Sequence, residues 1–306
     1  MTENKHNTTD NRPVYILGGN ALACYLGATL TNAGERVILL TDDVKKNKLN
    51  SQGITLKEGL RKKHYTFETA VWTKEEPKLL IITSDISTLH SDLSALTPSK
   101  ICNAPVICFT LLKDTAYLRD ILGCNFAKAV FDGWLLQNNQ HIALADTTPA
   151  VTVYTPLNEK SAAVLEECFI QTPLKLTFSE NECQTFWSHF TVYAAASLVT
   201  AAYNQNLAQA VKNSNAAYSL NMIAEELCRL AEADKITLSP EDMLKRLYDI
   251  PADYIFPLQT EAPNGNAGEL DTVSSVIRQA SRRLNLKTPE TNNLIHHIYG
   301  IYLSIT

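Results

Sequence analysis

The stretch VYILGGNALACYLGATLTNAGERVILL, residues 14–40, decides the fold of this chain. Its first four residues are an apolar run that predicts a buried strand, and Gly18-Gly19 predicts a tight turn directly after it. The next segment, Ala21 to Asn32, predicts a helix, which Gly34 would end. Residues 37–40 form a second apolar run and predict a second strand. Together these signals indicate a β-α-β unit, the building block of a parallel sheet.

The turn of this unit carries an altered form of the glycine pattern that binds dinucleotides. The usual pattern is G-x-G-x-x-G, and its three glycine positions read Gly18, Asn20 and Ala23 here. Asparagine tolerates unusual backbone angles better than most residues, and alanine is a known variant at the third position. We therefore predict a cofactor loop at Gly18, Gly19, Asn20 and Ala21, where the helix N-terminus can bind an anion. The alternative is a vestigial fold without a ligand.

The residues after the second strand bear on which dinucleotide would bind. They read Thr41-Asp42-Asp43. An acidic residue at this place accepts a hydrogen bond from the ribose 2′-hydroxyl and repels a 2′-phosphate, so Asp42 in that role would favour NAD(H). Two alternatives stay open: Asp42 and Asp43 only cap the next turn, or Lys45 or Lys46 pairs with a 2′-phosphate.

Composition excludes several classes of protein. The chain has 306 residues, 45% hydrophobic content and a formal net charge of −5, which predicts one large or two medium domains and argues against a mainly electrostatic nucleic-acid binder. Its seven cysteines lack zinc-site spacing, so we predict no metal. Residues 1–12 are polar and predict a disordered tail. Because no apolar run reaches the ~20 residues of a membrane span, we expect a cytoplasmic protein without a membrane partner.

The chain divides into two parts of different character. Residues 13–179 alternate apolar strands with helices, which predicts a Rossmann-type α/β domain with a parallel sheet covered on both faces. Residues 53–67 interrupt it with a small antiparallel excursion. Residues 180–306 contain only helical signals, with a Pro/Asn/Gly-rich linker at 257–268, and predict an all-α C-terminal domain. Its Ala-rich helices would pack within one subunit or form a homodimer through the helical domain.

The opening segment resembles that of the ketopantoate reductase (2-dehydropantoate 2-reductase) family. GGNALACYLGATLTNAG follows the family's G-A-G-A-I-G-x-Y-L-G-x-x-L-x-x-A-G. Shorter likenesses follow in the right order, at Trp187 (W-x-K), at 268–271 (T-E-I-D) and at 288–292 (T-P-x-N). The resemblance implies a C-terminal helical bundle like that of 6-phosphogluconate dehydrogenase. It also implies NADP(H)-dependent reduction of a small 2-oxo acid, ketopantoate above all, in a cleft between the domains.

The positions that carry the family's chemistry differ in this chain. His189 stands where the resemblance places the catalytic lysine, and Tyr193 where it places an asparagine. Glu269 matches the family's acidic residue. The remaining replacements are Asp85 for a strand-end lysine, Asp42 or Asp43 for an arginine, Thr110-Leu111-Leu112 for an H-N-G motif, and Phe256-Pro257 near the substrate-binding serine.

The substituted residues could still reduce a ketone. Reduction of a 2-oxo acid needs a proton donor beside the developing alkoxide and a cation beside the carboxylate. His189 can donate a proton near neutral pH, and Tyr193, four residues further on, shares its helix face. Glu269 could orient the substrate hydroxyl or His189. We predict these three as catalytic residues, and the candidates for the cation are Lys212, Lys245 and Arg278.

Two other hypotheses stay open beside this one. His189 and Tyr193 could be ordinary helix residues at a domain interface, in a binding or regulatory protein that has lost its activity. The chain could also be a reductase of the same superfamily that acts on another small polar substrate.

Overall fold

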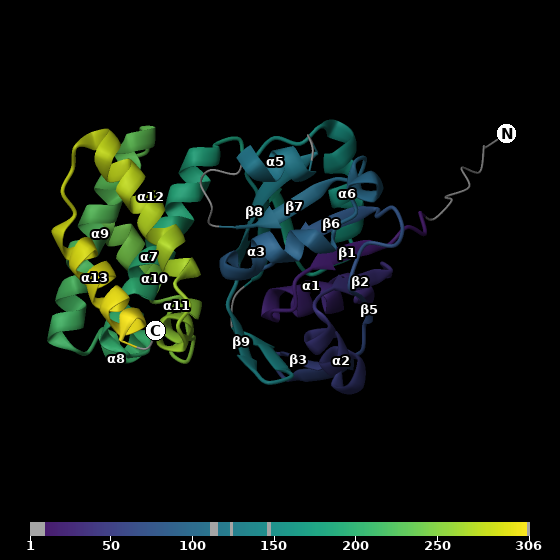
Figure 1. The fold of residues 1–306 in the computed structure, drawn as a ribbon, viewed down its shortest axis with the longest axis horizontal. Coiled ribbons are helices and arrows are strands. Elements are labelled where there is room, and N and C mark those ends of the chain that lie inside the picture. Colours follow the sequence, from purple (N-terminus) through teal and green to yellow (C-terminus); the bar gives the residue numbers. More distant parts are fainter. Residues whose placement is uncertain (1–9, 111–115, 123–124, 146–147, 305–306) are drawn as a thin grey trace.

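The structure, a computed structural model, describes residues 10–110, 116–122, 125–145 and 148–304. It confirms the predicted fold class: an α/β domain of Rossmann type stands beside an all-helical domain (Figure 1). Two predicted features lie outside the described residues, namely most of the N-terminal tail (1–9) and Leu111-Leu112 of the segment that replaces the H-N-G motif.

The core of the first domain is an eight-stranded sheet in the order β12-β11-β8-β7-β6-β1-β2-β5. Its strands pair in parallel, except that β11 runs antiparallel to β8. The inner strands are short apolar runs, and every residue of β1, β2 and β6 is buried, as expected of a sheet covered on both faces. The bounds are β1 Val14–Leu17, β2 Val37–Leu40, β5 Glu68–Ala70, β6 Leu79–Ile82, β7 Val106–Phe109, β8 Phe126–Asp132, β11 Ala150–Val153 and β12 Lys175–Phe178.

Helices cover both faces of this sheet because side chains alternate between the faces along each strand. One face packs against α1 (Ala21–Asn32) and α6 (Glu159–Phe169) in a single apolar cluster. The other face packs against α3 (Ile86–Asp92), α4 (Pro98–Ile101) and α5 (Ala116–Leu122). The parallel β-α-β arrangement predicted from residues 14–40 is present with the predicted helix bounds.

The antiparallel excursion forms a second, four-stranded sheet in the order β4-β3-β10-β9. Strands β3 (Ile54–Glu58) and β4 (Arg61–Tyr65) pair antiparallel as predicted. Strand β9 (Leu135–Asn138) turns back into β10 (His141–Leu144), which adds to β3 in parallel. Helix α2 (Asp43–Gln52) leads into this sheet. No apolar periodicity predicts this helix, because Leu49 is its one buried residue.

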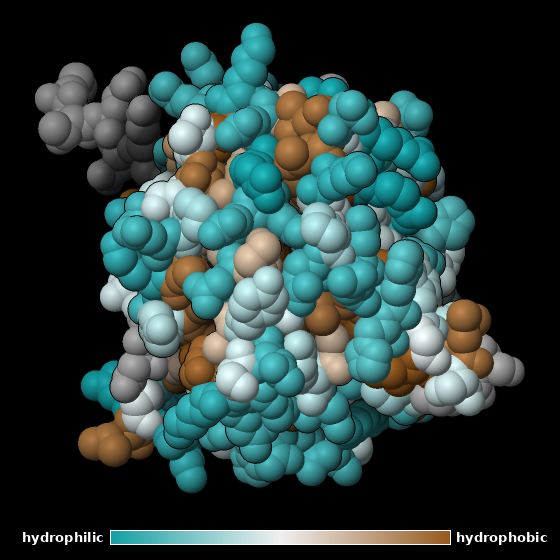
Figure 2. Space-filling model, turned by 90° about the vertical axis from the view of Figure 1, so that its left-hand side faces the viewer, coloured by the Kyte–Doolittle hydropathy of each residue, from teal (hydrophilic) through white to brown (hydrophobic). Residues whose placement is uncertain are grey.

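The helical domain is built around α7, which runs for 22 residues from Glu182 to Tyr203 and ends at Asn204 in a left-handed conformation. The helices around it are α8 Leu207–Ala210, α9 Ser214–Ala231, α10 Pro240–Leu247, α11 Pro257–Glu261, α12 Gly268–Leu284 and α13 Pro289–Leu303. Helix α11 occupies part of the stretch predicted to be a linker, because Pro257 fits the first turn of a helix. The outer face of this domain is mostly polar, with small separate apolar areas (Figure 2). None of the described helices is long and apolar enough to cross a membrane.

A buried carboxylate fixes the start of the last helix. Glu226 of α9 is 1% exposed and accepts hydrogen bonds from the backbone N–H groups of Glu290 and Thr291 at 3.0 and 2.9 Å. The Thr291 hydroxyl donates to it at 2.6 Å. Since the first N–H groups of a helix have no partner within the helix, Glu226 provides the cap that Thr288 does not.

Replacing Glu226 by alanine should therefore destabilise the helical domain. We expect Glu226→Ala to lower the free energy of unfolding by roughly 2–4 kcal/mol, because buried donors at the start of α13 lose their acceptor. Denaturant unfolding followed by circular dichroism measures this change. Glu225→Ala, at an exposed position of the same helix, is the matched control and should change stability by less than about 0.5 kcal/mol. Equal effects of the two substitutions would contradict the capping role.

Candidate active site

The predicted cofactor loop lies at the carboxyl edge of the large sheet, between β1 and α1. Gly18 has a φ of +126°, and a Cβ there would meet the Thr83 hydroxyl at 2.6 Å, so glycine is required. Residues Gly19 to Leu22 are partly exposed. The N–H groups of Ala21 and Leu22 belong to the first turn of α1, where N–H groups lack partners within the helix. The loop therefore presents backbone donors at a helix N-terminus, the arrangement that binds phosphate.

Asn20 replaces the second glycine of the pattern, and its side chain forms hydrogen bonds that stabilise the loop. Its side-chain oxygen accepts from the Ala23 N–H at 3.0 Å and caps α1. Its amide nitrogen donates to the Thr83 carbonyl at 2.5 Å and to the Asp85 carboxylate at 3.0 Å. Asn20 thus connects the ends of β1 and β6, and its side chain caps the third N–H group of α1 and not the first two.

Asp42 lies at the end of β2, where it caps α2. Its carboxylate accepts from the Lys45 N–H at 2.8 Å, which is the capping arrangement that the sequence left open. The side chain is 55% exposed, so capping does not close it off. Lys45 lies over the cofactor loop: a Cβ on Gly19 would come within 2.9 Å of its Cδ. A carboxylate and an ammonium group therefore both flank the predicted cofactor loop.

On the helical side of the domain boundary, the buried side chain of Glu269 and the partly buried side chain of Tyr193 form a hydrogen-bonded pair, termed the buried pair. The Tyr193 hydroxyl donates to Glu269 Oε1 at 2.7 Å, which joins α7 to the first turn of α12. Burial raises the pKa of Glu269 to about 8, with the Tyr193 hydrogen bond acting against this and the charges of Glu261 and Asp85 adding to it. Burial and the Glu269 charge also raise the pKa of Tyr193 well above its usual range. Near neutral pH the pair therefore holds protons on both groups.

Asp85 links this pair to the cofactor loop. It accepts a hydrogen bond from Asn20 and its charge raises the pKa of Glu269 on the other domain. It also acts on Tyr254, whose pKa is raised to about 12 by burial first and then by Glu269 and Asp85. The charge of Asp85 at the carboxyl edge of the sheet therefore acts on the ionisable groups of the helical domain around Glu269.

Aromatic side chains surround the buried pair. Tyr254 stacks edge-on against Trp134 of the α/β domain and Phe256 of the helical domain, with ring centroids 4.8 and 4.9 Å apart. Phe256 also packs against Tyr193 at 5.5 Å and is fully buried. At the position where the resemblance placed a substrate-binding serine, the structure thus has an apolar ring and no hydroxyl.

His189 lies elsewhere on α7, one turn before Tyr193. Its Nε2 is 3.4 Å from Asp132 Oδ1 at the end of β8, and its side chain is 21% exposed. Burial lowers the pKa of His189, the Asp132 charge raises it, and the Arg246 charge lowers it again. The structure therefore places His189 and Tyr193 on one helix, as predicted, and gives them different carboxylate partners.

The three cations proposed from the sequence do not share one location. Lys245 has a 72% exposed side chain and pairs with Asp242 within α10. Lys212 and Arg278 are also exposed. The cation beside His189 is Arg246, whose guanidinium Nη1 donates to the Ser188 carbonyl at 2.5 Å.

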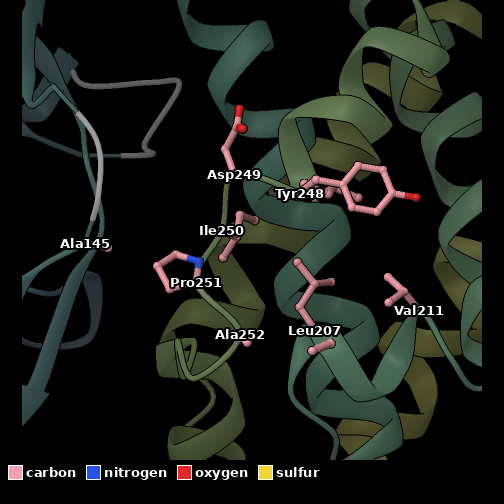
Figure 3. Close-up of a pocket in the computed structure, with 10 residues that line it drawn as sticks. Ala145, Leu207, Val211, Tyr248, Asp249, Ile250, Pro251 and Ala252 are labelled. Atoms are coloured by element: carbon pink, nitrogen blue, oxygen red, sulfur yellow. The ribbon is translucent and has the colours of Figure 1, made fainter.

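A cavity of about 480 Å³ opens farther along the domain boundary. In Figure 3, Ala145 of the α/β domain faces the residues of the helical domain that line it, and Leu207, Val211 and Tyr248 are among them. Its described lining is mainly apolar and includes none of the predicted catalytic or cofactor residues. We therefore place the candidate site at the buried pair and at His189.

Comparison with known proteins identifies the family of the chain. The family model "Ketopantoate reductase PanE/ApbA" matches residues 14–110, and "Ketopantoate reductase PanE/ApbA C terminal" matches residues 183–301. The chain belongs to the ketopantoate reductase family. The two matched segments contain Gly18, Asp42 and Asp85 on one side and His189, Tyr193 and Glu269 on the other. No curated protein matches the sequence.

Solved structures share this fold at low sequence identity. A D-mandelate dehydrogenase in complex with NADH and anilino(oxo)acetate has a TM-score of 0.83 and 16% identity, over 96% of this chain and 99% of that one. A PanE/ApbA family ketopantoate reductase from Ralstonia eutropha has a TM-score of 0.80 and 17% identity over the same shares. A dimeric ketopantoate reductase from Staphylococcus aureus has a TM-score of 0.74 and 13% identity, over 96% and 100%. These likenesses show the common two-domain fold.

Several residues of the site could not be found from the sequence. Asp132, Tyr254 and Arg246 approach the site only through contacts between elements that are distant in the chain. Trp134 follows Gly133 directly after a strand, and this local pattern marks a turn in which a functional side chain can lie. No comparable pattern marks Arg246, since it lies between exposed Lys245 and buried Leu247 on an ordinary amphipathic helix.

The raised pKa of Glu269 predicts a pH-dependent stability. Because the folded chain holds this proton more tightly than the unfolded chain, free energy of unfolding is lost as pH rises from 4.5 to about 8. Glu269→Gln removes this loss and keeps an oxygen that can accept from Tyr193. We expect the variant to gain stability relative to the original chain across this range, by at most about 1.4 kcal/mol per pH unit.

Denaturant unfolding at several pH values measures this difference. Glu241→Gln, at an exposed position of α10, is the control for a change of charge alone. A difference between Glu269→Gln and the original chain that stays constant with pH would show that Glu269 ionises normally.

Proposed function

We propose that this chain reduces a small 2-oxo acid with a nicotinamide cofactor, and that the substrate is ketopantoate, reduced to pantoate in pantothenate biosynthesis. The observation that carries the proposal is the Tyr193–Glu269 pair. It is buried in the helical domain and coupled through Asp85 to the loop that fits a dinucleotide. Membership of the ketopantoate reductase family supports the same reaction class.

The residues around the first turn fit a dinucleotide. The N–H groups of Ala21 and Leu22 would hold the pyrophosphate, and Gly18 and Gly19 allow the backbone to approach it. Family resemblance implies NADP(H), whereas a contact of Asp42 with the ribose would favour NAD(H). When bound, the cofactor supplies the hydride.

The chain's own residues would supply and position the proton. His189 would give a proton to the developing alkoxide oxygen, with Asp132 stabilising its charged form. Glu269 would hold its proton near neutral pH and donate a hydrogen bond to a substrate oxygen, with its other side fixed by Tyr193. The aromatic rings of Tyr254 and Phe256 would exclude water from this space.

One observation favours a second function. Phe256 is fully buried against Tyr193 and Tyr254, so the place of the expected substrate-binding serine is filled. This arrangement supports a cofactor-binding or regulatory protein without turnover, or a reductase for a different small 2-oxo acid. Oxidation of NADH and NADPH by the purified chain with ketopantoate and a panel of other 2-oxo acids tests all three. Cofactor binding without any turnover would favour the regulatory protein.

Two properties of the whole molecule remain predictions. We expect a homodimer through the helical domain, and we expect the protein in the cytoplasm. The mass of the chain in solution, measured by light scattering, tests the first.

The proton-donor role of His189 predicts a distinctive pH profile. The turnover number for reduction should rise as pH falls through the pKa of His189, which burial places below 6.5. We expect His189→Ala to lower the turnover number by about 100-fold or more and to remove this dependence. Steady-state kinetics across pH 5–9 measures both effects.

A second variant tests the partner of His189. Asp132→Asn removes the charge that supports the protonated imidazole, so the rise in turnover should move to lower pH. Asp253→Asn, which is exposed, is the control. An unchanged profile in His189→Ala would show that the proton comes from another group.

The charge of Asp42 is expected to set the relative affinity of the chain for NADH and NADPH. Asp42→Asn keeps the capping oxygen but loses the charge, so repulsion of a 2′-phosphate disappears. We expect the Kd for NADPH to fall relative to that for NADH, by about tenfold or less. Fluorescence titration measures both constants, and Asp43→Asn, which is adjacent and 73% exposed, is the matched control. If both variants leave the ratio unchanged, Asp42 does not contact the ribose.

A further inference from the structure

A 2-oxo acid places a strict demand on the site that reduces it. Its carboxylate carbon is bonded directly to the carbonyl carbon, so the cation that binds the carboxylate must neighbour the group that donates a proton to the carbonyl oxygen. Under the proposed function, on which this inference rests, that donor is His189. The cation must therefore lie beside His189, and none of the three cations proposed from the sequence meets this condition.

We propose that Arg246 binds the carboxylate of the substrate. Its guanidinium lies against α7 at the residue before His189, where Nη1 donates to the Ser188 carbonyl at 2.5 Å. Its side chain is partly buried, between exposed Lys245 and buried Leu247. The charge of Arg246 lowers the pKa of the His189 imidazole, in agreement with this placement.

The guanidinium of Arg246 has N–H donors beyond the one that binds the Ser188 carbonyl. Among the residues that the structure describes, no carboxylate lies within ion-pair distance of it, whereas Lys245 pairs with Asp242 and Lys128 pairs with Glu182. A guanidinium has five N–H donors in a planar fork, and the Ser188 carbonyl uses one. The remaining donors match the two oxygens of a carboxylate.

The charge arrangement around His189 also suits an anion. Asp132 is on the α/β side of the imidazole, and Arg246 approaches from α10 on the helical side. A carboxylate bound to Arg246 would be next to the imidazole and would add to the support that Asp132 gives its protonated form. Substrate binding would then raise the fraction of His189 that carries the proton to be transferred.

The experiment compares a charged substrate with its neutral ester. Kinetics with ketopantoate and with ketopantoate methyl ester are measured in the full-length chain, together with the Kd of the cofactor. For Arg246→Ala we expect KM for the acid to rise about 10- to 100-fold, because a charged hydrogen-bonded pair is lost. KM for the ester and the cofactor Kd should change less than about threefold. Arg246→Lys should recover part of the loss, and Lys245→Ala, the neighbouring exposed cation, should match the original chain.

Each other outcome contradicts a specific statement. An unchanged KM for the acid in Arg246→Ala, with turnover intact, overturns the role of Arg246 and leaves the proposed function standing. An equal loss with acid and ester, accompanied by a lower unfolding temperature, shows that Arg246 only holds α10 against α7 and also overturns the inference. If the original chain binds cofactor but neither reduces ketopantoate nor binds anilino(oxo)acetate, the proposed function fails and the inference fails with it.

Discussion

The burial of α7 is the constraint on which the rest of this structure depends. Fourteen of its 22 residues are buried, far more than one face of a surface helix. Its residues Phe186, Trp187 and Phe190 belong to one apolar cluster with Val130 of β8 and with Tyr154, which follows β11. The same cluster forms the core of the helical domain. Since one helix is shared by both cores, the side chains along it have fixed positions relative to the sheet. Glu182 accordingly forms an ion pair with Lys128, and His189 lies beside Asp132. Tyr193 donates a hydrogen bond to Glu269.

The electrostatics of the site follow from this burial. Glu269 and Tyr193 are removed from water together, so the acid keeps its proton near neutral pH and both groups remain uncharged. His189 experiences the same loss of water, which disfavours its charged form, and Asp132 offsets part of this cost. One physical effect thus shifts the acid and the base towards neutrality. An enzyme using these groups would depend on the negative charge of the substrate to protonate His189, and Arg246 would hold that carboxylate beside the imidazole.

The parts of the fold that could be predicted were those with strong local signals. The run 14–40 fixed β1, α1 and β2 because its apolar strands are bounded by glycines and its helix by Asn20 and Gly34. Helix α2 was missed because it is polar and buries only Leu49, so it has no apolar periodicity. Helix α11 is not predicted because Pro257 begins a Pro/Asn/Gly-rich stretch that is typical of a linker, although proline is also favoured in the first turn of a helix.

The sequence by itself determined the two-domain architecture, the family and the positions at which its chemistry has been substituted, because each is encoded in residues adjacent in the chain. The tertiary structure alone decided which side chains meet. It paired Tyr193 with Glu269 and His189 with Asp132, filled the place of the expected serine with Phe256, and brought Arg246 rather than Lys245 to α7. The physical reason is that these contacts join elements 50 or more residues apart, and their geometry is set by how two cores pack around one helix. No local pattern of polarity or spacing records that packing.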